Sequence, residues 1–326
     1  MNDLILSGIQ PSASQVHIGN YLGAMKRFVA LQEKYPLILC IVDLHALTSV
    51  SRKEDIASNS FSLAAAYLAL GLTSESTIIF RQSDIPEVCE LAWYFACQFP
   101  LGLLERAHAF KDKKAKKEQV NAGLMFYPIL MAADILLYKA TKVPVGPDQK
   151  QHLEMAREIA EKFNHHFGTS FPVPEPLIDM EMGVVPGLDG RKMSKSYDNY
   201  IGLFESEKDI TKKIKRIITD SKGVEDKKDP ETCTIFRLYK LFASTAEVED
   251  LRSQYLKGGL GYGAAKELLL KAVIGELSPL RERYEAYLSK PGEVREILAE
   301  GAKRGALIAS ETLLEVRESL GFFPKR

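Results

Sequence analysis

The sequence predicts an α/β fold in which a doubly wound parallel sheet is followed by a smaller, mostly helical C-terminal domain. Before Tyr200, short apolar runs alternate with stretches whose apolar residues recur at helical spacing. After Tyr200 the helical spacing continues, and no strand-like run of comparable quality occurs. Alternating strands and helices predict a parallel sheet with helices on both faces, in a Rossmann-like arrangement.

The predicted strands are apolar runs at residues 4–6, 37–42, 77–80 and 142–145. The run at 37–42 is apolar at every position, which is typical of a strand buried on both faces of a parallel sheet. Helices are predicted over residues 18–29, 56–70 and 149–163, and a nearly unbroken helical region is predicted over 264–320.

The chain is long enough for more than one domain, since its 326 residues exceed the usual ~100 to 200 residues of a single domain. The change of pattern predicts a first domain over residues 1–199 and a helical domain over 200–290. A C-terminal helix within 291–326 is expected to return and pack on the first domain.

Composition and charge limit the classes of function. Hydrophobic residues make up 46% and charged residues 26%, which is typical of a globular protein. Lys plus Arg and Asp plus Glu both number 43, so any contact with RNA must use local basic patches. No secretory signal and no membrane span is recognisable, and a cytoplasmic protein is therefore expected.

The four cysteines are scattered along the chain, at Cys40, Cys89, Cys97 and Cys233. None has a neighbour at the spacing of metal ligands or of a redox pair. They are predicted to be buried thiols, and no metal site is expected.

Residues 10–20 follow the first predicted strand, where open α/β sheets bind their ligands. Gly19 would let a flat adenine approach the backbone, His17 could donate to a phosphate oxygen, and Asn20 offers an amide to ribose or phosphate. Taken alone, this segment is better explained as a loop that ends in a capped helix with a surface histidine.

A second polar segment, residues 190–196, reads Gly-Arg-Lys-Met-Ser-Lys-Ser. Lys192 and Lys195 with their neighbouring hydroxyl groups predict a mobile cationic loop that suits the charge of a triphosphate. A solvated basic linker is the alternative. Neither G-x-x-x-x-G-K-[ST] nor G-x-G-x-x-G occurs, which argues against a P-loop hydrolase and a dinucleotide enzyme. Residues 17–20 and 192–196 together predict an enzyme that activates a substrate with ATP.

A carboxylate is predicted on the apolar face of a third segment, residues 127–138. Pro128 is expected to start a helix in which Met131, Asp134, Ile135 and Tyr138 share one face. A buried carboxylate needs a donor, either a neighbouring side chain or an N–H group of a ligand. Residues 143–145 are expected to line the same pocket.

The segment 146–152 follows a predicted strand and opens a helix, which places Asp148 at an N-cap position. Its carboxylate would either accept from ribose hydroxyl groups or simply cap the helix.

Five ordered motifs, at residues 8–12, 17–20, 130–138, 145–152 and 192–196, resemble bacterial tryptophanyl-tRNA synthetases, a family of class I aminoacyl-tRNA synthetases. The resemblance covers nearly the whole chain. Asn20 stands where the class usually has His, although the tryptophan branch commonly has Asn. Leu6 stands where relatives often carry an aromatic side chain, so a stacking contact from that position is absent.

The resemblance implies which residues bind each substrate. ATP would contact Gln10, Pro11, Ser12, Gly19, Asn20, Gly146, Pro147, Asp148, the backbone at Val185, Lys192, Met193, Ser194, Lys195 and Ser196. Tryptophan would contact Asp134, Met131, Tyr127, His45, Gln149, Val143 and Val145, with Asp134 accepting the indole N–H. Catalysis would rest on His17, Asn20, Lys192, Ser194 and Lys195.

The resemblance also implies the reaction and its partners. Tryptophan is activated with ATP, whose phosphates carry Mg²⁺, and is transferred to tRNA(Trp) by a homodimer. The first domain would hold ATP and tryptophan, and the second would bind the anticodon. Two basic clusters are candidates for RNA contact, at Lys212, Lys213, Lys215 and Arg216 and at Lys113, Lys114, Lys116 and Lys117. The alternatives are a tyrosyl-tRNA synthetase and a non-catalytic paralogue that binds amino acid or tRNA.

Overall fold

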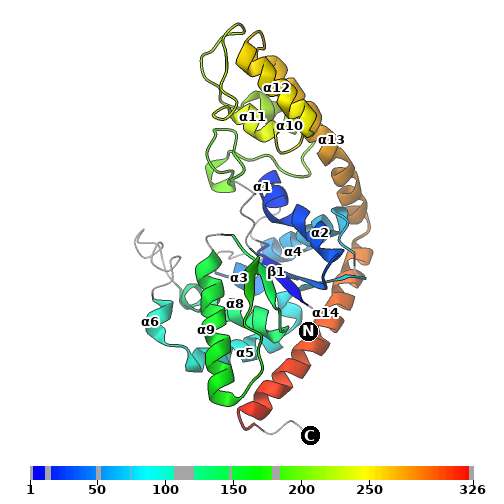
Figure 1. The fold of residues 1–326 in the computed structure, drawn as a ribbon. Coiled ribbons are helices and arrows are strands. Elements are labelled where there is room, and N and C mark those ends of the chain that lie inside the picture. The colour runs from blue at the N-terminus through cyan, green and yellow to red at the C-terminus, as the bar shows by residue number, and fades with distance from the viewer. Residues whose placement is uncertain are drawn as a thin grey trace.

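A parallel sheet of five strands forms the centre of the computed structural model, which describes residues 3–11, 16–48, 53–73, 75–105, 121–146, 149–177 and 184–322 (Figure 1). From one edge to the other the strands are β3 (Thr77–Arg81), β2 (Leu37–Ile41), β1 (Ile5–Ile9), β4 (Lys142–Pro144) and β5 (Glu175–Leu177). All pairings are parallel, and Ile5 in β1 pairs with Leu37 on one side and Lys142 on the other.

The helical segments of the described residues lie between the strands as far as β5 and follow one another after it. They are α1 (Ile18–Asn20), the π-helical turn η1 (Tyr21–Met25), α2 (Lys26–Gln32), α3 (Asp43–Ala46), α4 (Lys53–Ala69), the 3₁₀ turn η2 (Gln82–Asp84), α5 (Glu87–Gln98), α6 (Leu101–Leu104), α8 (Ala122–Leu137), α9 (Lys150–Phe167), the 3₁₀ turn η4 (Lys195–Tyr197), α10 (Glu207–Lys215), α11 (Thr234–Tyr239), α12 (Thr245–Lys257), α13 (Tyr262–Ser289) and α14 (Pro291–Ser319).

Strand β2 shows that both faces of the sheet are covered. Its residues are all buried because they enter two cores in turn. Leu37, Leu39 and Ile41 pack with α1, α2, α4 and α13, whereas Ile38 and Cys40 pack with α5, α8, α9 and α14. The doubly wound α/β fold predicted from the sequence is confirmed.

Strand β5 is absent from the predicted strands. Its sequence, Glu-Pro-Leu, is three residues long, and it pairs only with β4 at the edge of the sheet. A run this short with a proline carries no apolar periodicity, and proline is confined to edges and strand ends.

The C-terminal part is helical, as predicted. In Figure 1, α13 and α14 run one after the other along one side of the molecule, from α10–α12 at the top to the C-terminus at the bottom. The first apolar core continues without a break into this part, because Ile210 of α10 and Phe236 of α11 belong to the same cluster as Ile18 and Met25. The predicted domain boundaries at 199/200 and 290/291 stay a prediction.

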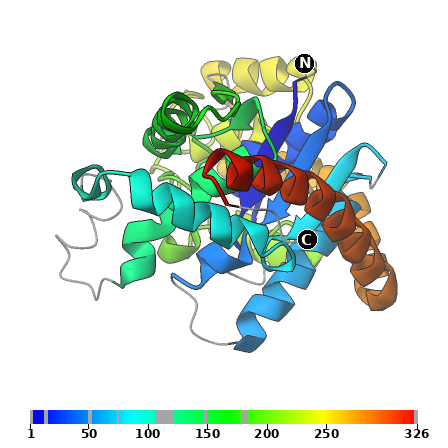
Figure 2. The same cartoon turned by 90° about the horizontal axis from the view of Figure 1, so that it is seen from below.

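Helix α14 lies directly against the edge strand β3. In Figure 2, which views the molecule from below, α14 runs across the front of the other elements. The approach is possible because Gly301 has no side chain: a Cβ atom there would lie 1.9 Å from the carbonyl oxygen of Ile79. At Gly305 a Cβ atom would lie 2.7 Å from Cδ1 of Ile85. Further along, Arg317 donates two hydrogen bonds to Glu90, at 2.7 and 2.6 Å.

The prediction that Pro128 starts a helix is wrong. Helix α8 begins at Ala122, where the Asn121 side chain accepts the Leu124 N–H at 2.8 Å. An asparagine cap determines the start, and Pro128 lies buried inside the helix, where the Leu124 carbonyl loses the partner that an N–H at position 128 would provide.

The prediction of buried thiols holds for Cys40 but is wrong for two cysteines of α5. Cys89 and Cys97 are exposed, and Cys233 is half-buried. Positions 89, 93 and 97 recur every four residues, so the two thiols share the outer face of α5 with the exposed Trp93. None of the described helices is both long and apolar enough to cross a membrane.

Candidate active site

A cavity of about 540 Å³ opens at the carboxyl ends of β1 and β4. The chain leaves β1 toward β2 and β3 on one side, and the later strands β4 and β5 fill the other side. The cavity therefore lies at the topological switch point, where open α/β sheets bind ligands.

Many of the residues predicted to bind substrates line this cavity. They are Gln10, Asn20, His45, Tyr127, Met131, Asp134, Val143, Val145, Gly146 and Gln149. Pro11, His17, Gly19, Val185 and 192–196 do not line it. Ser12, Pro147 and Asp148 lie outside the described residues.

Residues 17–20 form a tight capping box at the start of α1. His17 Nδ1 accepts the Asn20 N–H at 3.3 Å, and Asn20 Oδ1 accepts the His17 N–H at 3.2 Å. The segment is also tied to a distant part of the chain. Ile18 donates its N–H to the carbonyl of Ile201 at 3.0 Å, and Leu203 donates to the carbonyl of Val16 at 2.8 Å.

His17 is held as a neutral ring. Burial, and then the positive charge of Lys195, lower its pKa to about 4. Because Nδ1 is the acceptor for Asn20, the proton of the neutral ring sits on Nε2. His17 can therefore donate a hydrogen bond from Nε2 at neutral pH, which is what the sequence predicts for a phosphate contact.

The two polar segments predicted to form one nucleotide site lie side by side. Gly19 faces the side chain of Met193, and the charge of Lys195 is close enough to His17 to lower its pKa. Burial lowers the pKa of Lys195 itself. Lys192 is exposed. A cationic loop thus lies beside the glycine and histidine of residues 17–20.

Asn199 holds that loop in shape, and sequence reasoning missed it. Its Oδ1 accepts the Ser194 N–H at 2.8 Å, and its Nδ2 donates to the Lys192 carbonyl at 3.1 Å and to Asp189 at 2.7 Å. Met193 adds a backbone hydrogen bond to Val185 at 2.9 Å. Asn199 is buried, and its hydrogen bonds tie the backbone of this loop to the residues on either side of it.

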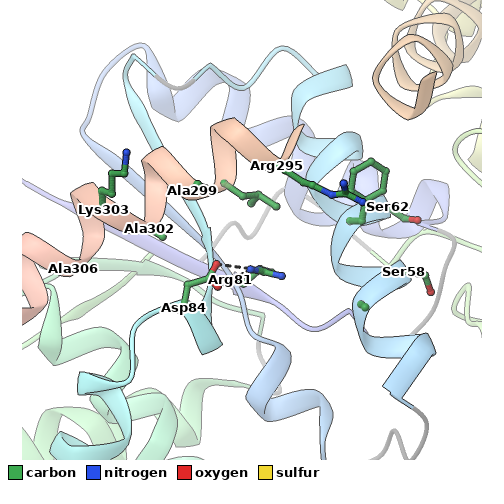
Figure 3. Close-up of a pocket in the computed structure, with 12 residues that line it drawn as sticks. Ser58, Ser62, Arg81, Asp84, Arg295, Ala299, Ala302, Lys303 and Ala306 are labelled. Carbon is green, nitrogen blue, oxygen red and sulfur yellow. Dashed lines mark hydrogen bonds and ion pairs between the residues drawn. The ribbon is translucent and has the colours of Figure 1, made fainter. Parts of the chain in front are cut away.

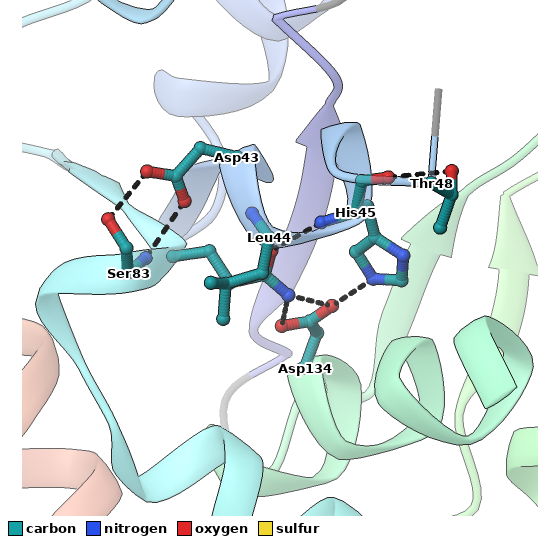
Figure 4. Close-up of polar contacts among 7 residues, drawn as sticks. Asp43, Leu44, His45, Thr48, Ser83 and Asp134 are labelled. Atoms are coloured by element: carbon teal, nitrogen blue, oxygen red, sulfur yellow. Dashed lines mark hydrogen bonds and ion pairs between the residues drawn. The ribbon is translucent and has the colours of Figure 1, made fainter. Parts of the chain in front are cut away.

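Asp134 lies at the apolar end of the cavity with donors already in place (Figure 4). Gln82 Nε2 lies 2.7 Å from Oδ1 and 2.9 Å from Oδ2, and His45 Nε2 lies 2.9 Å from Oδ2. Neighbouring side chains therefore fill most of the hydrogen-bond acceptor positions of this carboxylate. A neighbouring side chain as donor was one of the two alternatives that the sequence leaves open. No arginine contacts it among the described residues.

Tyr127 and Gln149 are linked through His152. The Tyr127 hydroxyl lies 2.5 Å from His152 Nε2, and His152 Nδ1 lies 3.1 Å from Gln149 Oε1. An amide oxygen accepts, so Nδ1 donates to it and Nε2 accepts from the tyrosine. Burial raises the pKa of Tyr127 to about 12, so its hydroxyl stays protonated.

A family model described as tRNA synthetases class I (W and Y) matches residues 3–278. The chain belongs to this family. It is 46% identical to a tryptophan–tRNA ligase from Campylobacter jejuni (strain RM1221), over 97% of this chain and 99% of that protein. It is 45% identical to a tryptophan–tRNA ligase from Fusobacterium nucleatum, over 97% of each chain.

A solved structure matches this synthetase chain over nearly its whole length. It is the tryptophanyl-tRNA synthetase from Campylobacter jejuni complexed with ADP and tryptophan. The TM-score is 0.92 and the identity 45%, and the match covers 98% of this chain and 100% of that one. The resemblance to tryptophanyl-tRNA synthetases is confirmed.

The synthetase has a second, larger cavity, of about 870 Å³, between α4, the end of β3 and α14. Figure 3 shows the Arg81–Asp84 ion pair beside Ala299 and Ala302 of α14. No residue predicted to bind a substrate lines it. The smaller cavity is therefore the candidate active site.

The basic cluster of α10 is partly neutralised. Lys213 pairs with Glu205 at 2.5 Å and Lys212 with Asp209 at 3.2 Å, whereas Lys215 and Arg216 are exposed. Lys113, Lys114, Lys116 and Lys117 lie outside the described residues. No described group of three His, Cys, Asp or Glu side chains is placed to hold a metal ion.

Proposed function

We propose that this chain is a tryptophan–tRNA ligase, which forms tryptophanyl-adenylate from tryptophan and ATP and then charges tRNA(Trp). The observation that carries the proposal is a single cavity with a buried acceptor, Asp134, at its apolar end and residues 17–20 and 192–196 beside its other end. Close similarity to tryptophan–tRNA ligases along the whole chain supports it.

The tryptophan subsite is the apolar end of the cavity. Asp134 accepts the indole N–H, and Met131, Val143 and Val145 contact the faces of the ring. Tyr127, His45 and Gln149 complete the wall. Phenylalanine has no N–H for the acceptor position of Asp134 that Gln82 and His45 leave open. A site built to hydrogen-bond its substrate rejects an analogue that lacks the donor by about 10⁴- to 10⁵-fold.

The ATP subsite is the polar end. Gly19 admits the adenine, while Gln10, Asn20, Gly146 and the backbone at Val185 contact base and ribose. Pro11 is fixed for the same purpose, because the Asn59 side chain donates to its carbonyl at 3.1 Å. The positive charges of Lys192 and Lys195, the Ser194 and Ser196 hydroxyls and the Nε2–H of His17 face the phosphates. Ser12, Pro147 and Asp148 are proposed to contact ATP on the family resemblance alone, because they lie outside the described residues.

The chemistry needs no protein nucleophile. A carboxylate oxygen of tryptophan attacks the α-phosphorus of ATP, the bond to the β-phosphate oxygen breaks, and pyrophosphate leaves. The 2′-oxygen of the terminal adenosine of tRNA then attacks the carbonyl carbon, and AMP leaves. The protein contributes positioning and stabilises the charge that develops on the phosphates. Mg²⁺ belongs to the substrate, bound through the ATP phosphates.

The helical part over 200–290 binds the anticodon in this proposal, and the exposed Lys215 and Arg216 contact the RNA backbone. The protein works in the cytoplasm as a symmetric dimer. The dimer interface is proposed to include Trp93 on α5, Leu101 on α6 and Phe126 on α8, which are 64%, 59% and 43% exposed in the single chain. Sedimentation of the wild type and of Trp93→Asp tests it, and a wild type that sediments as a monomer contradicts it.

ATP–pyrophosphate exchange with tryptophan, tyrosine or no amino acid tests the function. We expect exchange with tryptophan only, followed by charging of tRNA(Trp). Exchange with tyrosine would favour a tyrosyl-tRNA synthetase, and a complete absence of exchange with either amino acid would favour a non-catalytic paralogue.

A further inference from the structure

Gln82 lies behind the tryptophan subsite and contacts the carboxylate at its end. Gln82 Nε2 reaches both oxygens of Asp134, at 2.7 and 2.9 Å. Both side chains are buried, with 1% of Gln82 and 4% of Asp134 exposed. Asp134 lines the cavity, whereas Gln82 does not. Any influence of Gln82 on a bound amino acid must therefore pass through Asp134 and its neighbours.

The other end of the Gln82 amide is fixed as well. Its Oε1 accepts the N–H groups of Leu44 at 3.2 Å and His45 at 3.3 Å. These N–H groups belong to the first turn of α3, and the N-cap residue Val42 makes no side-chain hydrogen bond to that turn. Because oxygen must face these donors, Nε2 must face Asp134, and a flipped amide would lose every one of these bonds.

The hydrogen bonds leave one position of the Asp134 carboxylate open. An ionised carboxylate has about four lone-pair positions, two on each oxygen. Oδ2 accepts from Gln82 and His45, so both of its positions are used. Oδ1 accepts only from Gln82, so one position remains on this oxygen.

We infer that Gln82 is a positioning residue for amino-acid recognition: it fixes the Asp134 carboxylate so that a single lone-pair position, on Oδ1, is presented to the indole N–H. The inference rests on the proposed function. A carboxylate without this anchor can rotate and accept donors from other directions, which weakens tryptophan binding and relaxes selectivity. His45 shares the effect, since Gln82 holds the backbone that carries its ring.

A neighbouring contact provides a matched control. Asp43 accepts the Ser83 N–H at 2.9 Å and the Ser83 hydroxyl at 2.5 Å (Figure 4). This contact joins the same two segments, the start of α3 and the turn after β3, without touching Asp134. Loss of the Ser83 hydroxyl therefore weakens the contact between these two segments but leaves the hydrogen bonds of Gln82 to the Asp134 carboxylate in place.

The test compares Gln82→Met with Ser83→Ala in ATP–pyrophosphate exchange. Met keeps the length of the side chain but offers no N–H donor. We expect the KM for tryptophan to rise about 10- to 100-fold in Gln82→Met, the range for leaving a buried charged group without a donor. The KM for ATP should change less than about twofold in both variants. A KM does not depend on the fraction of protein that folds, so partial misfolding does not blur the comparison.

A double-mutant cycle with Asp134→Asn separates positioning from a structural role. If Gln82 acts through Asp134, Gln82→Met has a much smaller effect on kcat/KM for tryptophan when Asp134 is already Asn. Additive effects, equal changes in both KM values, or an unchanged KM for tryptophan would overturn the inference. A wild type without tryptophan-dependent exchange would instead overturn the proposed function.

Discussion

The Cβ atom that Gly19 lacks would lie 3.5 Å from the Cβ atom of Met193. Residues 17–20 follow the first strand, and residues 192–196 follow the last. Their contact through a glycine brings together two segments, far apart in the sequence, that are proposed to bind the phosphates of ATP.

Gly19→Ala should weaken ATP binding. The new Cβ atom would lie 2.9 Å from Nδ1 and Cε1 of His17, so the ring must move off the Asn20 N–H. We expect the KM for ATP to rise about 10-fold, which corresponds to roughly 1.4 kcal/mol, with little change in the KM for tryptophan. Gly23→Ala is the control, because no atom lies within 4 Å of its added Cβ. Equal behaviour of the two variants in exchange kinetics would contradict the prediction.

Lys195→Ala should slow the formation of the adenylate. Removing one preorganised donor to a developing charge costs about 10²- to 10³-fold in rate. The measurement is single-turnover formation of tryptophanyl-adenylate by rapid quench. The exposed Arg191, which pairs with Asp189, provides the control, and Arg191→Ala should stay within about threefold of the wild type. An unchanged rate in Lys195→Ala would show that Lys195 does not contribute to adenylate formation and would contradict the proposed role of residues 192–196.

Asp134→Ala should reduce selectivity for tryptophan more than ATP binding. The variant loses the only buried carboxylate in the described cavity wall, so the indole N–H has no acceptor there. We expect the preference for tryptophan over phenylalanine in the exchange reaction to fall by at least about 100-fold. If the KM values for ATP and tryptophan rise equally, Asp134 has only a structural role.

His17 should titrate near pH 4 in the free protein, below its ordinary value of 6.5. Between these values the unfolded chain binds the proton and the folded protein does not. The contribution of His17 to stability is therefore complete above about pH 6.5 and is lost as the pH falls toward about 4. NMR titration of the imidazole nitrogens checks the pKa. When the free energy of unfolding in urea is measured at pH 7 and at pH 5, its decrease between the two pH values should be smaller for His17→Asn than for the wild type.

Gly301→Ala should destabilise the fold without touching the active site. The added Cβ atom would lie 1.9 Å from the Ile79 carbonyl oxygen, so α14 must move away from β3. We expect the free energy of unfolding to fall by about 2 kcal/mol or more. Gly275→Ala, inside α13 with no atom within 4 Å, should instead gain up to about 1 kcal/mol in helix propensity. Denaturant unfolding of the two variants measures both effects.

The sequence predicts the elements with strong periodicity and misses those determined by single contacts. The run at 37–42 is apolar throughout because β2 is covered on both faces, so its burial is visible in the sequence. The start of α8 depends on one hydrogen bond from Asn121, which outweighs the signal of Pro128. Exposure of Cys89 and Cys97 depends on which face of α5 turns outward, and composition alone does not give this.

The candidate site shows the same division. The motifs predict Asp134 and residues 17–20, and the family resemblance predicts His45. All of them lie at the cavity or beside it, but the side chains that hold them are missed. Gln82 follows the strand β3 directly, and its position at the carboxyl end of a strand was a usable signal. Asn199 offered no such signal, since its role depends on the path of the chain between 185 and 199.

The contact of Gly301 with Ile79 also has a consequence during synthesis. Strand β3 forms the rim of the sheet and is made more than 200 residues before α14. A growing polypeptide therefore carries this rim uncovered, open to strand addition by other chains, until α14 has emerged from the ribosome. Truncated products that lack α14 should aggregate, because α14 is the helix that covers the edge of β3 in the described structure.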